Sequence, residues 1–207
     1  MKCIIKNHGP ENSLVEEKGD KMDILEVIKS RRSIRQFKND RVSDEALNIL
    51  LEAARWAPSW ANTQCWEFVV VRNPEIKERL SKTLSPNNPA TDAIANAPVV
   101  IVACAKTGIA GYYKGKPTTD KGDWYMFDVA LAMQNLILAA HSIGLGTVHV
   151  GAFDAQEGAK ILRVPSGIVV VEMTPVGIPQ KEVTSPTPRK ELSQFVYYDR
   201  YGSTSPD

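Results

Sequence analysis

Ser30-Arg31-Arg32-Ser33-Ile34-Arg35-Gln36-Phe37 places three guanidinium groups and two hydroxyl groups within six residues. Arginine presents a planar fork of N–H donors that matches the oxygens of a phosphate, and serine adds a compact donor that loses little rotamer entropy. Taken alone, such a stretch is more often a solvated basic loop, because runs of charge usually face water. The rest of the chain decides between an anion site and a basic surface.

Composition indicates a globular protein with a substantial core. The chain has 207 residues, of which 43% are hydrophobic and 24% are charged, close to the average for soluble domains. A chain of this length can form one large domain or two small ones. The net charge of +1 gives no overall electrostatic case for binding nucleic acid or a membrane surface. An anion site must therefore be local.

The cysteines and apolar runs favour a soluble cytoplasmic protein. Cys3, Cys65 and Cys104 are scattered and lack Cys-x-x-Cys spacing, which argues against a disulfide framework and against a zinc site. The N-terminal apolar run, residues 3–5, is too short for a secretory signal. The longest apolar stretch, residues 129–143, contains polar side chains and is too short to span a bilayer. We expect neither membrane nor nucleic-acid partners.

Capping signals predict a series of helices. Residues 1–21 show no periodicity and are expected to form a loosely packed tail, followed by one domain over residues 22–207. Asp23, Ser43, Asn73 and Asp154 each stand before a helical pattern as candidate N-caps. The helices are expected to cover residues 24–30, 44–57, 74–84, 123–143 and the stretch after Asp154. The fourth is apolar around most of its circumference and should be buried.

Short apolar runs predict the strands of a central sheet. Residues 68–71 and 99–104 read as buried strands, and residues 147–153 and 168–176 supply two more. Pro175 predicts an edge or the end of the last strand, because proline cannot donate to a ladder. We therefore expect an α+β fold, with a mixed sheet of about four strands packed between helices.

The C-terminal segment combines prolines with exposed-looking apolar residues. Pro179, Pro186 and Pro188 precede Arg189 and Lys190, and residues 192–198 are rich in apolar and aromatic side chains. Such content does not stay in water. The segment must dock either on its own domain or on a second subunit.

Four stretches together resemble the nitroreductase family of FMN-binding flavoproteins. They are residues 31–37, residues 57–66 (Ala-Pro-Ser-Trp-Ala-Asn-Thr-Gln-Cys-Trp), residues 144–153 (Gly-Leu-Gly-Thr-Val-His-Val-Gly-Ala-Phe) and residues 188–190 (Pro-Arg-Lys). Each is a weak signal alone, but the four occur in the order and at separations typical of the family. The resemblance runs from about Met22 to Tyr201.

The resemblance implies a site for FMN. Arg31 and Ser33, with Arg32 beside them, would meet the FMN phosphate, joined by Arg189 and Lys190. Clustered cationic donors suit a phosphate dianion. By the same resemblance, Arg35 would lie beside flavin N1 and the C2 carbonyl, where negative charge collects on reduction.

The ring contacts are implied in the same way. The loop Pro58, Ser59, Trp60 and Asn62 resembles the segment that the other subunit contributes. Gly151 would present its N–H near flavin N5, flanked by His149 and Val150, and Asp128 would fall near the ribityl chain. Relatives often have tryptophan at the position of His149 and proline at that of Cys65.

Simpler interpretations stand beside these. His149 between two valines is more often a partly buried, hydrogen-bonded histidine than a catalytic acid. Asp128 at the start of a buried helix is also compatible with a cap or a paired charge. Nothing orders Cys65 with a histidine as a nucleophile, and His141 and His149 belong to different elements, so no metal site is expected.

The family resemblance implies a homodimer in which the C-terminal tail wraps the partner. It also implies an oxidoreductase that transfers hydride from NAD(P)H through FMN to a nitroaromatic or a quinone, by a ping-pong mechanism. The alternatives are a related flavin enzyme with another acceptor (a flavin reductase, an enone reductase or a dehalogenase) and a protein that only binds FMN.

Overall fold

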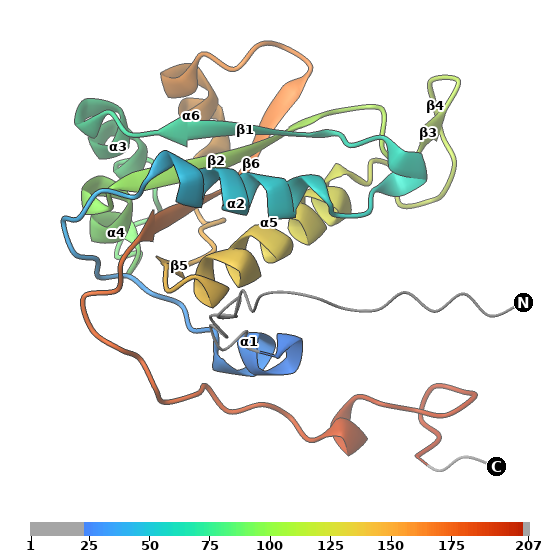
Figure 1. Cartoon of the computed structure of the whole chain (residues 1–207). Coiled ribbons are helices and arrows are strands. Elements are labelled where there is room, and N and C mark those ends of the chain that lie inside the picture. Colours follow the sequence, from blue (N-terminus) through green and yellow to red (C-terminus); the bar gives the residue numbers. More distant parts are fainter. Residues whose placement is uncertain (1–22, 205–207) are drawn as a thin grey trace, which may run out of the picture.

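The computed structural model describes residues 23–204 (Figure 1). The tail expected at residues 1–21 lies outside the described residues. None of the described helices is both long enough and apolar enough to cross a membrane.

A four-stranded sheet forms the centre of the fold, with strand order β1-β2-β6-β5. The strands are β1 (Trp66–Val71), β2 (Val99–Lys106), β6 (Ile168–Gly177) and β5 (Gly146–Thr147), and neighbouring strands run antiparallel. The parallel component is an isolated bridge between Ser33 and Thr147. A separate hairpin, β3 (Tyr112–Tyr113) with β4 (Lys116–Pro117), projects from one end (Figure 1).

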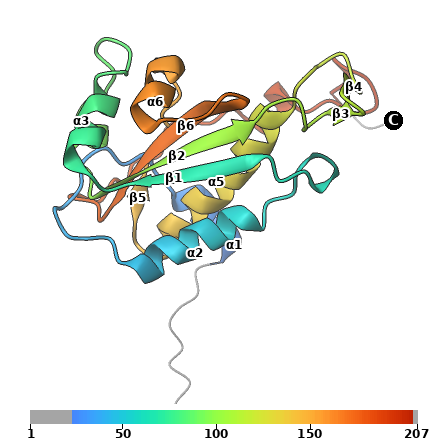
Figure 2. The same cartoon turned by 90° about the horizontal axis from the view of Figure 1, so that it is seen from above.

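Helices cover both faces of the sheet, so the predicted α+β architecture is confirmed. The helices α2 (Asp44–Arg55) and α5 (Tyr125–Ser142) lie on one face, with α1 (Ile24–Ser30) beside them (Figure 2). The helices α3 (Pro74–Ser81), α4 (Thr91–Asn96) and α6 (Ala155–Leu162) lie on the other face. β2 separates two apolar clusters and is buried from Val99 to Ala105, as its continuous apolar run predicts.

Three of the four predicted N-caps are confirmed by a side-chain hydrogen bond. The side chains of Ser43, Asn73 and Asp154 accept from the backbone N–H groups three residues further on. Asp23 makes no such bond. In α1 only Val27 is buried, while Ile24 and Leu25 remain 60% and 56% exposed. The apolar face predicted for α1 is therefore largely uncovered within one chain.

Several predictions about the strands differ from the structure. The strand expected at residues 147–153 is only β5, followed by an isolated bridge from Val150 to Met173. β1 was expected to be buried but forms an edge of the sheet. Pro175 lies in the central strand β6, opposite Val100 and two residues before the strand ends at Gly177, so it is near the end of the strand and not on an edge strand. Proline is tolerated there because the pairing of β5 with β6 stops at Val176.

The C-terminal segment leaves the domain after β6 and makes few contacts with it. The N–H of Gln180 donates to the carbonyl of Gln36, and beyond that point every residue up to Phe195 is exposed. A single 3₁₀ turn, η2 (Leu192–Gln194), breaks the extended path (Figure 1). Leu192 and Tyr201 are 70% and 93% exposed. The exchange of this tail onto a partner stays a prediction.

Candidate functional site

The arginine stretch is fixed beside β5. Arg31 ends α1, and the N–H of Ile34 donates to the carbonyl of Thr147 at 2.8 Å. The side chain of Ile34 is buried against Gly146, where an added Cβ would lie 2.8 Å from it. Only glycine permits this approach. The first and third of the four stretches found in the sequence are thereby brought together.

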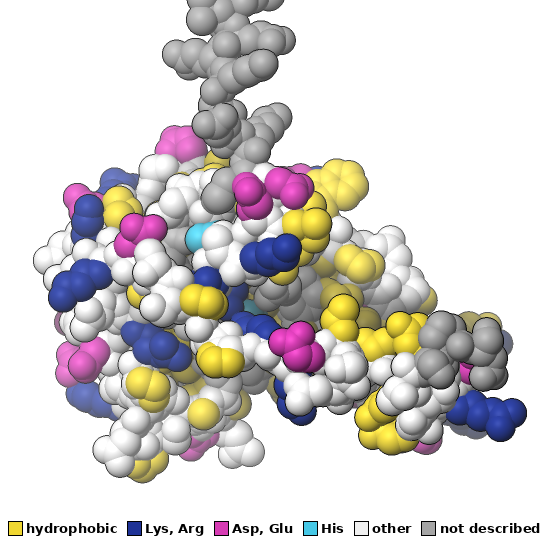
Figure 3. Space-filling view, turned by 90° about the horizontal axis from the view of Figure 1, so that it is seen from below, with side chains coloured by type: hydrophobic (Ala, Val, Ile, Leu, Met, Phe, Trp, Pro, Cys, Tyr) yellow, Lys and Arg dark blue, Asp and Glu magenta, His cyan; other side chains and the backbone are white. Residues whose placement is uncertain are grey.

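Positive charges converge at this place without forming an ion pair, although Glu182 and Asp92 lie nearby. The pKa of Arg31 is lowered, first by burial and then by the positive charges of Arg189 and Arg32. In the described part of the chain, no ion pair includes Arg31, Arg32, Arg35, Arg189 or Lys190. Figure 3 shows Lys and Arg side chains beside a hollow between the main body and the C-terminal segment. Such a cluster fits an anion.

Arg32 differs from its neighbours because its guanidinium group contacts backbone carbonyls. It donates to the carbonyls of Lys29 at 2.7 Å and Arg31 at 2.9 Å, and more weakly to that of Thr184 at 3.5 Å. Its Nε is buried and has no hydrogen-bond partner. Arg32 therefore braces the stretch against the start of the C-terminal segment.

A serine–histidine contact adjoins this cluster, and sequence reasoning missed it. The hydroxyl of Ser30 lies 2.8 Å from Nε2 of His141, in the last turn of α5. Burial and the positive charges of Arg31 and Arg32 lower the pKa of His141. Ser30, Arg32, Ile34 and His141 line a cavity of about 390 Å³ that is closed on its other side by residues 179–184.

On the other side of the arginine stretch, a second cavity of about 440 Å³ is lined by Ser33, Arg35 and Lys181. Ser33 and Arg35 are exposed, in contrast to Ile34 between them. The stretch therefore divides its polar groups between two neighbouring hollows.

The residues after β5 expose backbone and a paired histidine. Gly151 is exposed, and a Cβ added there would meet no atom within 4 Å, whereas Val150 is buried. Nδ1 of His149 lies 2.9 Å and 3.1 Å from the two carboxylate oxygens of Glu172. A carboxylate that faces Nδ1 fixes the orientation of the ring. Glu172, on β6, was not predicted from the sequence.

The loop 58–65 lies at the opposite end of α5. Trp60, in the 3₁₀ turn η1 (Trp60–Asn62), packs against Trp124 in a tilted arrangement with ring centroids 5.0 Å apart. The hydroxyl of Ser59 accepts from the N–H of Gln64, and Pro58 and Asn62 are exposed. Asp128, which contacts this loop, is thirteen residues from His141, or about 20 Å along the helix. One chain therefore does not bring the loop and the arginine cluster together.

Asp128 requires a correction. Its side chain is 0% exposed, and its carboxylate oxygens accept hydrogen bonds from Trp60, Thr63 and Cys65. A side chain with no exposed surface cannot touch a ligand, so the expected contact with a ribityl chain is wrong. The structure shows a buried carboxylate that is held by hydrogen bonds and has no ionic partner among the described residues.

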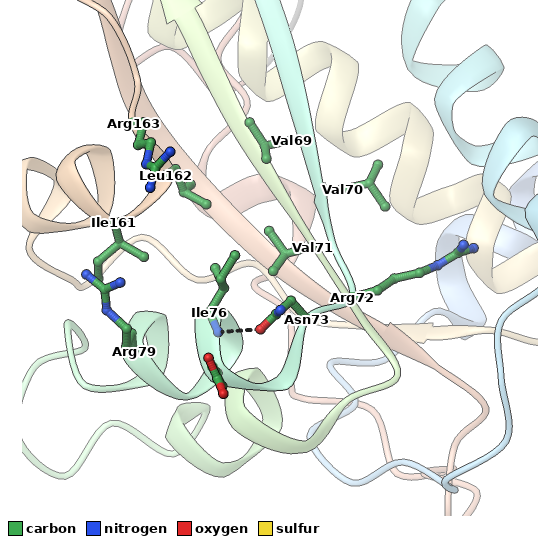
Figure 4. A pocket seen from close by; sticks show the side chains of 11 residues that line it. Val69, Val70, Val71, Arg72, Asn73, Ile76, Arg79, Ile161, Leu162 and Arg163 are labelled. Atoms are coloured by element: carbon green, nitrogen blue, oxygen red, sulfur yellow. Dashed lines mark hydrogen bonds between the residues drawn. The ribbon is translucent and has the colours of Figure 1, made fainter.

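A further groove lies elsewhere and contains none of the predicted residues. Its volume is about 670 Å³, and it runs between β1, α3 and α6 (Figure 4). Arginines at its rim include Arg79 and Arg163, while Arg72 is paired with Asp44 at 2.5 Å. Among the described residues, no cluster of three or more His, Cys, Asp or Glu side chains could hold a metal ion.

Comparison with known proteins identifies relatives across this architecture. The family model described as "Nitroreductase family" matches residues 28–93 and 84–178. A Methanothermobacter thermautotrophicus protein, provisionally named NADH dehydrogenase/NAD(P)H nitroreductase, is 34% identical over 169 residues, covering 80% of this chain and 82% of the relative.

Two further relatives differ in their named activities. The structure of an FMN-dependent nitroreductase from Clostridium difficile R20291 is similar with a TM-score of 0.71 and 26% identity, covering 86% of this chain and 99% of that one. Iodotyrosine deiodinase 1 of Sus scrofa is 29% identical over 212 residues, covering 90% of this chain and 71% of the relative.

Proposed function

The chain belongs to the nitroreductase family, and on this premise we propose that it is an FMN-dependent oxidoreductase. The reductant is NAD(P)H, and the acceptor is an electron-poor molecule such as a nitroaromatic or a quinone. When bound, FMN would supply the redox chemistry, which is the transfer of hydride from NAD(P)H to the acceptor in a ping-pong cycle.

The unpaired arginine cluster is the observation that carries this proposal. Burial and the nearby positive charge of Arg189 lower the pKa of Arg31, because both disfavour the charged form of its side chain. A bound dianion would remove that penalty. Arg31, Ser33, Arg189 and Lys190 would hold the FMN phosphate, with the positive charge of Arg32 beside them.

The proposed contacts with the flavin ring depend on the position of residues 31–37 beside β5. The Ser33–Thr147 bridge sets Arg35 and the residues after β5 on neighbouring segments. Arg35 would lie beside flavin N1 and stabilise negative charge there. Gly151, which has no Cβ, lets its N–H approach N5, with Val150 and the Glu172-bound ring of His149 beside it.

The proposal includes a homodimer, because half of the site is distant within one chain. Pro58, Ser59, Trp60 and Asn62 would reach the flavin held by the partner. Apolar side chains around α1 and α2 remain uncovered, among them Ile28 at 49% and Trp56 at 72% exposure. A second subunit would bury them, and the C-terminal tail would wrap it. The proposal includes a cytoplasmic location, since Cys65 and Cys104 are buried and form no disulfide in the described part of the chain.

The first test measures flavin content. The purified protein should show the absorption of bound FMN and should be bleached anaerobically by NADH or NADPH. Arg31→Ala combined with Arg189→Ala should raise the FMN dissociation constant at least tenfold, because two charge-assisted contacts are lost.

Arg79→Ala is the matched control, since it removes an exposed arginine from the groove of Figure 4. Equal FMN stoichiometry in the double variant and the control after dialysis would show that the phosphate lies elsewhere. A yellow protein that neither nicotinamide bleaches would support a protein that only binds FMN.

Reductive dehalogenation is a second candidate function, favoured by the similarity to iodotyrosine deiodinase 1 over 90% of this chain. Flavin reduction and enone reduction are further members of the same class. Steady-state rates with a nitroaromatic, a quinone, an enone, free flavin and an iodinated phenol would separate them, because the preferred acceptor has the highest kcat/KM.

A further inference from the structure

Asp128 is a carboxylate enclosed entirely by its own chain. It lies in the first turn of α5, and its side chain is 0% exposed. In the described part of the chain, no ion pair includes it. A buried charge without an ionic partner is costly unless hydrogen bonds satisfy it. The hydrogen-bond donors to its carboxylate therefore indicate the role of Asp128.

All three of its partners come from one loop. Oδ1 accepts from the N–H of Trp60 at 2.9 Å, and Oδ2 accepts from the hydroxyl of Thr63 at 3.3 Å. The thiol of Cys65 donates to Oδ2 at 3.6 Å. A single side chain thus holds the start, the middle and the end of the segment 60–65.

The backbone of that loop is strained. Ala61, Asn62 and Gln64 have φ values of 43°, 56° and 47°, in the left-handed region that side chains with a Cβ disfavour. Residues in such conformations persist only where the surroundings determine them, and they gather at functional sites. The hydrogen bonds to Asp128 supply this constraint, together with the packing of the Trp60 ring against the Trp124 ring.

The thiol of Cys65 serves the same arrangement. Burial, the charge of Asp128 and their hydrogen bond raise its pKa to about 12. It therefore remains protonated and acts as a donor to the carboxylate, which excludes a nucleophilic role at neutral pH.

We propose that Asp128 is a positioning residue that holds the strained loop 60–65 in the shape that contacts the flavin of the partner subunit. Asp128 itself touches no ligand. This inference rests on the proposed function, because that function assigns Trp60 and Asn62 to the flavin.

Asp128→Asn tests the inference with little change in volume. An amide offers one acceptor oxygen in place of two, and its NH₂ group would face the Thr63 hydroxyl and the Cys65 thiol. Asp123→Asn is the matched control: Asp123 lies at the same helix end but accepts from the N–H groups of Gly108 and Tyr125, not from the loop.

Two measurements are made on the full-length dimer: the FMN dissociation constant of the reconstituted apoprotein, and hydrogen exchange of peptides covering residues 58–66. We expect Asp128→Asn to raise the dissociation constant at least tenfold and to accelerate exchange in the loop. Its circular dichroism and its dimeric state should match those of the wild type. Asp123→Asn should stay within twofold of the wild type in both measurements.

The outcomes separate this inference from the proposed function. If the wild-type protein binds no FMN, the proposed function fails and the inference fails with it. If the wild type binds FMN and Asp128→Asn binds it equally well, the proposed function stands and the positioning role is overturned. Unchanged exchange in the loop would overturn it as well. If Asp128→Asn does not fold, Thr63→Val is measured instead, since it removes a single donor; unchanged affinity and exchange there would also count against the inference.

Discussion

His141 links the charge of the proposed phosphate site to pH. Burial, followed by the positive charges of Arg31 and Arg32, lowers the pKa of its imidazole, so the ring is neutral at neutral pH. Because the pKa in the folded protein lies below the ordinary value of about 6.5, the unfolded chain binds the proton more readily. The stabilising contribution of the neutral ring is therefore present above that ordinary value and is lost as the pH falls below it.

We predict that FMN raises the pKa of His141. A phosphate held by Arg31 and Arg189 would offset the repulsion that now opposes protonation of the ring. NMR titration of the His141 ring in the apoprotein and in the FMN-loaded protein measures this change directly. A His141 pKa that is identical in the two states would place the phosphate away from Ser30 and His141.

At the scale of single elements, α6 ends in an unfavourable conformation. Its C-cap, Arg163, has φ 57° and ψ 41°, which is the left-handed region usually occupied by glycine at helix ends. An L-residue there costs roughly 1–2 kcal/mol, and the greater freedom of glycine in the unfolded chain offsets part of the gain from replacing it.

Arg163→Gly should therefore raise the free energy of unfolding by about 0.5–1 kcal/mol. Urea denaturation monitored by circular dichroism measures this change. Arg163→Ala is the matched control, because it removes the same side chain but keeps the Cβ that causes the strain. Equal stability of the two variants would mean that the arginine side chain, not the backbone conformation, sets the stability of this helix end.

Elements whose signals are local could be predicted from the sequence, and those that depend on a distant partner could not. Ser43, Asn73 and Asp154 begin their helices with bonds that span three residues. The stretch after Thr147 alternates like a strand, but only Val150 finds a bridge on β6. Which strand becomes an edge depends on the order of the strands in the sheet. No local pattern in the sequence specifies that order.

The distinction between local signals and distant contacts also holds for the candidate FMN site. The four stretches that resemble the nitroreductase family indicated the arginines and the loop, because each is a continuous motif. The contacts that sequence reasoning missed join residues far apart in the chain: 23 positions separate His149 from Glu172, and 111 separate Ser30 from His141. Asp128 was found, but its role was misjudged, because its partners lie more than 60 positions away.

An FMN site shared between two subunits and an FMN site within one chain predict different FMN contents for a dimer of two variant chains. In one variant chain, Arg31→Ala and Arg189→Ala remove the phosphate contacts. In a second, Trp60→Ala and Asn62→Ala remove the loop contacts. Each variant alone forms dimers in which both sites are damaged, so each should lose FMN.

In a mixed dimer the defects combine differently. One site receives both defects, whereas the other receives the intact arginines of the loop variant and the intact loop of the arginine variant. Co-expression with two affinity tags isolates this mixed dimer, and its FMN content can be measured by absorbance. We expect one bound FMN per mixed dimer. If arginines and loop served the same flavin within one chain, every site of the mixed dimer would be damaged, and it would be as colourless as its parents.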